Sequence, residues 1–70
     1  MANITDIVGN NIRKERLKKG WTQEQLAFEA NLHRAYVGQI ERAEKIIGIV
    51  NLQKMARALN IEIVKLFRGL

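Results

Sequence analysis

The sequence predicts an all-α fold, a compact bundle of five helices, on three observations. Apolar residues recur at intervals of three and four positions along most of the chain, which is the period of an amphipathic helix. The chain contains no proline and only five glycines, so the usual signals of strands and tight turns are scarce. No linker, repeat or low-complexity segment interrupts the pattern, which indicates a single domain over residues 1–70.

The composition describes a small, basic domain that depends on packing for its stability. With no cysteine, neither disulfides nor a cysteine-based zinc site can supplement the core. No apolar run approaches the roughly 20 residues of a membrane span, and no signal-peptide pattern opens the chain, so we expect a cytoplasmic protein without a membrane partner. The net charge of +5 and pI near 10.1 favour a polyanionic partner, of which nucleic acid is the commonest.

The first helix is expected to begin after Asn3 and to end at Gly20. Asn3 can accept hydrogen bonds from free backbone amides, and Asp6 lies in the first turn, where a carboxylate complements the helix dipole. Glycine favours the left-handed conformation that ends many helices. The expected apolar stripe consists of Ile4, Ile7, Val8 and Ile12.

The second and third helices are expected close together, with a short joint at residues 31–32. Thr22 followed by Gln25 is the capping-box pattern, so the second helix should begin there and run to about Ala30. Asn31 tolerates the left-handed conformation that the joint requires. The third helix is expected from about residue 33 to residue 42.

Two further helices complete the expected bundle. A helix over about residues 49–59 would bury Leu52, Met55, Ala56 and Leu59. A last short helix is expected over about residues 62–67.

The third helix has two chemically different halves. At about 100° per residue, one exposed arc holds Arg34, Ala35, Gly38, Gln39 and Arg42. The opposite half holds Tyr36, Val37, Ile40 and Glu41 and should face the bundle. Arg and Gln can form paired hydrogen bonds with base edges in the DNA major groove, and the two small residues would let the backbone approach the groove floor. An ordinary solvated face has the same composition and is the alternative.

Four segments appear in an ordered spacing that resembles a known family. They are WTQEQLA at 21–27, NL at 31–32, YVGQIER at 36–42 and NLQKMARAL at 51–59. Together they resemble the phage-repressor-type (Cro/Xre-like) helix-turn-helix family, which includes the restriction-modification controller proteins. The resemblance covers about residues 7–67 and places the helix-turn-helix at about 22–42. It implies a DNA-binding repressor or activator of transcription, usually homodimeric.

The resemblance also implies which residues contact a double-stranded DNA operator. Base reading is expected of Arg34, Ala35 and Gln39. Contact with the DNA backbone is expected of Gln23, His33, Tyr36, Arg42 and Lys45. Other roles stay open: a polar helix start for Gln23, helix capping or plain exposure for His33, packing for Tyr36, and an ion pair with Glu41 for Lys45.

Two structural interactions are expected as well. Arg16 and Glu41 match family positions that tie the first helix to the third, so we expect a buried or half-buried ion pair. A dimerisation region is expected at about 46–70, because so small a core can hardly bury every apolar residue there. Its expected interface residues are Ile47, Ile49, Val50, Ile63 and Phe67. The alternative is a monomer whose isoleucines complete the core.

Several function classes are disfavoured. One histidine, no cysteine and scattered carboxylates offer no catalytic site, metal site or cofactor site, and no small-molecule ligand is expected. RNA polymerase is a candidate partner besides DNA and a second copy of the chain. The alternative function is an antitoxin or adaptor of the same fold that works mainly by binding protein.

The chain departs from the family pattern after two of its helices. Glycine is common in the family at the positions of Asn31 and Ala43. We expect Ala43 to leave the third helix without its preferred left-handed stop.

Overall fold

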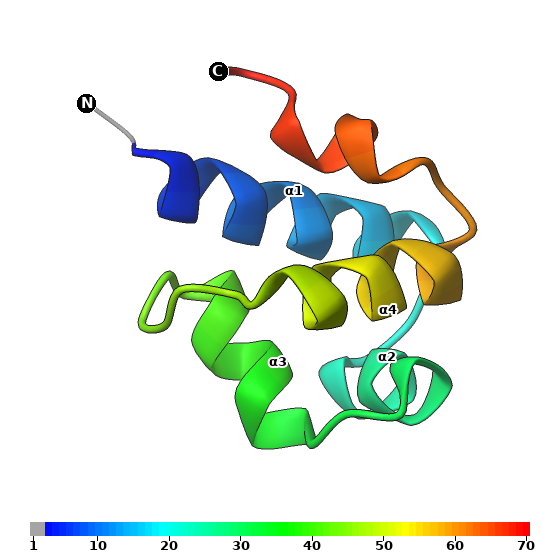
Figure 1. Cartoon of the computed structure of the whole chain (residues 1–70). Helices are drawn as coiled ribbons and strands as arrows, with labels where there is room; N and C mark the ends of the chain where they lie inside the picture. Colours follow the sequence, from blue (N-terminus) through cyan, green and yellow to red (C-terminus); the bar gives the residue numbers. More distant parts are fainter. Residues whose placement is uncertain (1–2) are drawn as a thin grey trace.

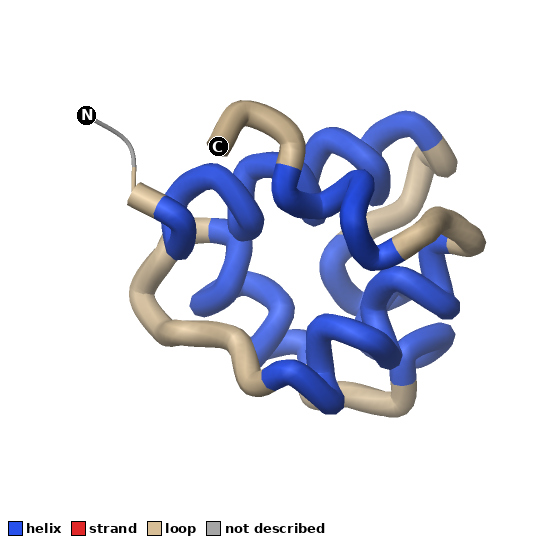
Figure 2. Tube along the Cα trace, turned by 45° about the horizontal axis from the view of Figure 1, so that its top comes forward, coloured by secondary structure: helices blue, strands red, loops and turns tan. Residues whose placement is uncertain are grey.

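The computed structural model describes residues 3–70, which form four α-helices and a short 3-10 helix without any strand (Figure 2). The elements are α1 (Ile4–Lys18), α2 (Gln23–Ala30), α3 (Arg34–Glu41), α4 (Ile49–Leu59) and the 3-10 helix η1 (Ile63–Phe67). The helix α1 packs against α3, α4 and η1, whereas α2 packs against α3 and α4 (Figure 1). Within residues 3–70, no helix has both the length and the apolarity to cross a membrane.

The all-α prediction is confirmed, but the prediction of five α-helices is wrong in the last element. Residues 63–67 form a 3-10 helix, in which the Lys65 N–H donates to the Glu62 carbonyl three residues earlier at 3.0 Å. So short a segment gains few α-helical hydrogen bonds, and no side chain caps its start, so the tighter 3-10 form is adopted.

A side-chain amide ties η1 to the first helix. The Nδ2 group of Asn11 in α1 donates to the carbonyls of Leu66 and Arg68, at 2.9 Å each. Leu66 is fully buried in the core. The segment is therefore held against the core although it is only five residues long.

The predicted starts of α1 and α2 are confirmed, and both carry a complete capping box. The Asp6 N–H donates to Asn3 Oδ1 at 3.0 Å, and the Asn3 N–H donates to the Asp6 carboxylate at 3.3 Å. Thr22 and Gln25 make the same reciprocal pair at 3.1 and 2.7 Å. These side chains satisfy amides that have no partner inside the helix.

One core contains buried residues of every element. These residues are Val8, Ile12, Leu26, Ala27, Ala30, Val37, Ile40, Leu52, Met55, Ala56, Leu59 and Leu66. The predicted stripe of α1 is wrong at Ile4, which is 51% exposed. Ile4 lies in the first turn of α1, at an open groove that it lines with Ile46 and Ile49.

The crossing of α1 over α3 requires a glycine. A β-carbon on Gly9 would clash with the carbonyl oxygen of Ile40. A glycine inside a helix is unusual, but the local sequence does not show which element approaches Gly9. Its role follows only from the close approach of the two helices.

All four α-helices end at a residue in the left-handed conformation. These residues are Gly20, Asn31, Ala43 and Asn60, with φ values of 71°, 57°, 59° and 57°. The expectation for Asn31 is confirmed, but the expectation that Ala43 deprives α3 of a left-handed stop is wrong. The Ala43 N–H donates to the Ile40 carbonyl at 3.0 Å and the Glu44 N–H to the Gln39 carbonyl at 2.8 Å. These two bonds form a Schellman motif, which holds an alanine in a conformation that its β-carbon disfavours.

We expect Ala43→Gly to stabilise the fold by about 0.5 to 1 kcal/mol, because glycine removes the steric cost of a positive φ. Urea denaturation followed by circular dichroism measures the change. Asn60→Gly is the matched control and should change stability by less, because asparagine already tolerates this conformation. A lower denaturation midpoint for Ala43→Gly than for the wild type would contradict the strain at Ala43.

Candidate nucleic-acid interface

The helix α3 presents a polar face outward and an apolar face to the core. Arg34 and Ala35 are exposed and Gln39 is half-buried, whereas Val37 and Ile40 are buried. The left-handed turn at Asn31 places the start of α3 directly after α2, and the two helices pack together. The polar face of α3 is therefore exposed, while α2 packs against the helix from behind.

The prediction that Gly38 lies on the exposed arc is wrong, because two side chains cover this residue. A β-carbon on Gly38 would lie 3.0 Å from Nη1 of Arg42 and 3.2 Å from Oε1 of Gln23. Gly38 is therefore buried and does not offer its backbone to a groove. Its lack of a side chain gives Arg42 and Gln23 room to pack over α3.

His33 caps the start of α3. Its Nδ1 atom accepts the N–H of Ala35 at 3.2 Å. The ring is exposed, so Nε2 remains available to donate a hydrogen bond outward. Capping and contact with a phosphate are thus compatible roles of this residue.

Arg16 and Glu41 form a bidentate ion pair between α1 and α3. The Arg16 Nε and Nη2 atoms donate to the two Glu41 carboxylate oxygens at 2.7 and 2.9 Å. The side chains are only 9% and 2% exposed. The hydrogen bond to Glu41 raises the pKa of Arg16, which keeps the guanidinium charged.

Two further hydrogen bonds complete the surroundings of this pair. Arg16 Nη1 donates to the carbonyl of Trp21 at 2.7 Å, and Gln23 Nε2 donates to Glu41 Oε1 at 3.1 Å. Gln23, expected to contact DNA, is therefore held in place by a buried carboxylate. Among the described residues, no buried side-chain polar atom lacks a hydrogen-bond partner.

Two arginines of the outer face pair with exposed carboxylates. Arg34 Nη1 donates to Glu24 Oε2 at 2.9 Å, and Arg42 donates to Glu44 through Nε at 2.9 Å and Nη2 at 3.2 Å. The hydrogen bond from Arg42 lowers the pKa of Glu44, and the same bond raises the pKa of Arg42. Neither carboxylate was expected to lie at this face.

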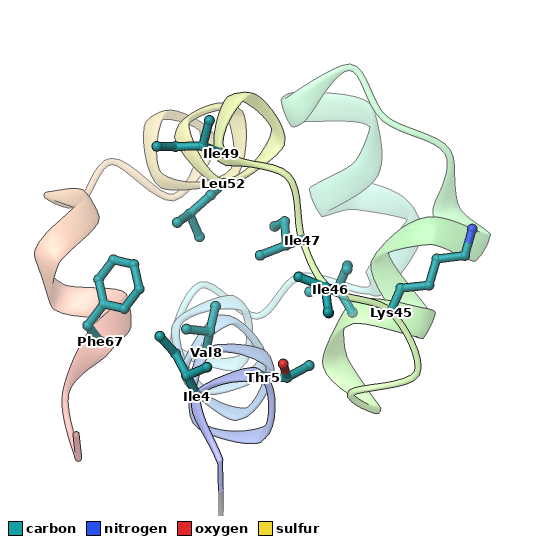
Figure 3. A pocket seen from close by; sticks show the side chains of 10 residues that line it. Ile4, Thr5, Val8, Lys45, Ile46, Ile47, Ile49, Leu52 and Phe67 are labelled. Atoms are coloured by element: carbon teal, nitrogen blue, oxygen red, sulfur yellow. The ribbon is translucent and has the colours of Figure 1, made fainter.

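Tyr36 and Lys45 occupy the edges of the face. The half-buried Tyr36 hydroxyl accepts the Asn51 Nδ2 group at 3.1 Å and so links α3 to α4. The alternative pairing of Lys45 with Glu41 is not formed, because α3 ends at Glu41 and Arg16 occupies its carboxylate. Lys45 is exposed, and its ammonium group points away from the neighbouring apolar groove (Figure 3).

The apolar groove lies between the start of α1, the turn before α4, and η1. Figure 3 shows Ile4 and Val8 on one side, Ile49 and Leu52 opposite, and Phe67 at one end. The groove has a volume of about 240 Å³. The residues predicted for a dimer interface divide into two groups. Ile49, Val50 and Ile63 are exposed, whereas Ile47 and Phe67 are partly buried against the core. Val64, absent from that prediction, is also exposed.

The outer face of α3 carries hydrogen-bond donors of the kind that contact nucleic acid. Across residues 3–70, no group of three or more His, Cys, Asp or Glu side chains could hold a metal ion. The outer face instead gathers guanidinium, ammonium and amide donors around α3. Such donors suit phosphates and base edges.

Comparison with known proteins gives consistent matches along the chain. A family described as helix-turn-helix matches residues 12–66. The control protein C.BamHI of Bacillus amyloliquefaciens is 39% identical over 61 residues, which are 86% of this chain and 75% of that protein. The control protein C.SmaI of Serratia marcescens is 39% identical over 64 residues, which are 91% of this chain and 76% of that protein.

A solved structure shares both sequence and fold with the chain. The restriction-modification controller protein C.AhdI from Aeromonas hydrophila is 43% identical, with a TM-score of 0.88 over 90% of this chain and 96% of that one. The family match over residues 12–66 includes both α2 and α3.

We expect Glu41→Ala to lower the free energy of unfolding by about 3 to 5 kcal/mol, because it leaves the Arg16 charge buried without a partner. Thermal and urea denaturation measure this loss. The matched control is Lys18→Ala, which removes the exposed Lys18–Glu15 pair and should cost less than about 1 kcal/mol. Melting of Glu41→Ala within about a degree of the wild type would show that the pair contributes little.

Proposed function

The chain belongs to the helix-turn-helix family, and from this membership we propose that it binds a palindromic DNA operator in the cytoplasm as a homodimer. It is a DNA-binding regulator of transcription. C.BamHI and C.SmaI are named control proteins, and C.AhdI is named a restriction-modification controller protein. These names support the proposal that this chain regulates genes of a restriction-modification system. The observation that carries the proposal is the outer face of α3, whose Arg34 and Gln39 stand beside further donors.

We propose that α3 enters the major groove as the recognition helix. Arg34 can bind the paired acceptors of guanine, and Gln39 can bind adenine through its donor and acceptor. Ala35, small and exposed between them, suits contact with a thymine methyl group. The backbone contacts are assigned to Gln23, His33, Tyr36, Arg42 and Lys45, which surround these three residues and would fix the helix in register.

The reach of one recognition helix and the exposed apolar residues support the proposed homodimer. A single recognition helix contacts too few base pairs to select one site in a genome, so two copies are needed. The turn before α4 and the start of α4 expose Ile46, Ile49 and Val50, and Ile46 is 85% exposed. A twofold contact through these residues and Ile63 would cover them and orient both α3 helices symmetrically. The half-sites would then be centred about 10 base pairs apart.

RNA polymerase is the proposed protein partner in regulation. A partner surface outside the dimer contact is available on α2, where Phe28 is 81% exposed beside Trp21 and Glu29. An exposed aromatic residue with a polar rim suits contact with another protein.

Selection of bound sequences from a random DNA pool tests binding, symmetry and half-site spacing together. On the selected site, we expect Arg34→Ala and Gln39→Ala each to cost about 1 to 3 kcal/mol, with little loss on random DNA. Fluorescence anisotropy of labelled duplexes measures both affinities.

Lys45→Ala is the matched comparison for these base-reading variants. It should weaken selected and random duplexes alike and reduce the slope of log affinity against log salt concentration by about one unit. Equal losses on both duplexes for Arg34→Ala would contradict its assignment to base reading.

The dimer is tested by sedimentation at micromolar concentration. We expect Ile49→Asp and Ile63→Asp to sediment as folded 8.0 kDa monomers that bind the operator weakly. An aspartate at residue 49 suits the first position of α4, so the monomer should remain folded. Phe28→Asp is the control and should stay dimeric. A wild-type monomer that still binds a single asymmetric site would exclude the proposed dimer.

A further inference from the structure

One edge of the Arg42 guanidinium group is paired with a carboxylate in the free protein. Its Nε and Nη2 atoms form a two-point contact with the Glu44 carboxylate, and its Nη1 atom lies over Gly38. The two side chains are 56% and 52% exposed, so the pair is accessible from solvent. The Glu44 carboxylate therefore occupies the edge of Arg42 that a DNA phosphate would bind.

Arg34 on the same face also meets an exposed carboxylate, but through a single hydrogen bond. Its Nη1 atom donates to the exposed Glu24 carboxylate at 2.9 Å, across the α2–α3 joint. Lys45 has no carboxylate within 4.0 Å in the described part of the chain, so Arg42 alone of these three cations makes a two-point contact.

Carboxylate and phosphate compete for the same edge of a guanidinium. Both accept a pair of parallel N–H donors, and one edge cannot serve both anions in this geometry. An exposed ion pair is weak, so DNA can displace the carboxylate. The displaced carboxylate then remains near the DNA backbone, where it repels the phosphates.

We propose that Glu44 is an internal competitor of DNA that sets the affinity of the interface. Glu44 occupies Arg42 in the free protein and is released when a phosphate binds there. This inference rests on the proposed function. It assigns a role in binding to a residue outside the recognition helix and of the same charge as DNA.

The test compares Glu44→Gln with the wild type by anisotropy, using the duplex selected from the random pool at fixed salt. We expect Glu44→Gln to bind about three- to fivefold more tightly, because the weak competing pair is gone. Glu62→Gln is the matched control. It makes the same change in net charge at an exposed residue before η1, where the structure has no ion pair among residues 3–70.

A double mutant separates competition for Arg42 from general electrostatics. In an Arg42→Ala background, Glu44→Gln should improve binding no more than Glu62→Gln does. If Glu44→Gln gains no more than Glu62→Gln in the wild-type background, or keeps its full gain without Arg42, the inference is wrong while DNA binding stands. If the wild type binds no duplex from the pool, the proposed function fails and the inference fails with it.

Discussion

The orientation of α3 depends on the buried ion pair between Arg16 and Glu41. Glu41 is the last residue of α3, and its carboxylate accepts hydrogen bonds from Arg16 in α1 and Gln23 in α2. Arg16 also holds the carbonyl of Trp21, in the joint between α1 and α2. One carboxylate therefore fixes three helices relative to each other. Because a bidentate pair tolerates little rotation, α3 is held at a defined angle.

Two glycines near this pair allow the surrounding helices and side chains to pack closely. Gly9 lets α1 reach the backbone of α3, and Gly38 gives space to the side chains of Gln23 and Arg42. The ion pair lies at the border between this packed region and the polar outer face. Such a pair adds little stability over apolar packing, but its geometry is specific, which suits a helix that must meet another surface in register.

Local patterns in the sequence predicted the elements well and their contacts less well. The capping boxes at Asn3 and Thr22 and the left-handed Asn31 depend on residues three positions apart or fewer, so the pattern alone indicates them. The burial of Gly38 and the exposure of Ile4 depend on which side chains from other elements cover them. The pairing of Arg34 with Glu24 joins residues ten positions apart in different helices, and no periodicity reports it.

The contact between α1 and η1 has a consequence for the order of events during synthesis. Asn11 binds the carbonyls of Leu66 and Arg68, 55 and 57 residues later, and Leu66 fills the core beside α1. A nascent chain therefore holds α1 without its final cover until residues 66–68 have left the ribosome. Helices α1 to α3 are translated before residue 66, so the part of the core that Leu66 covers stays open until that residue is available.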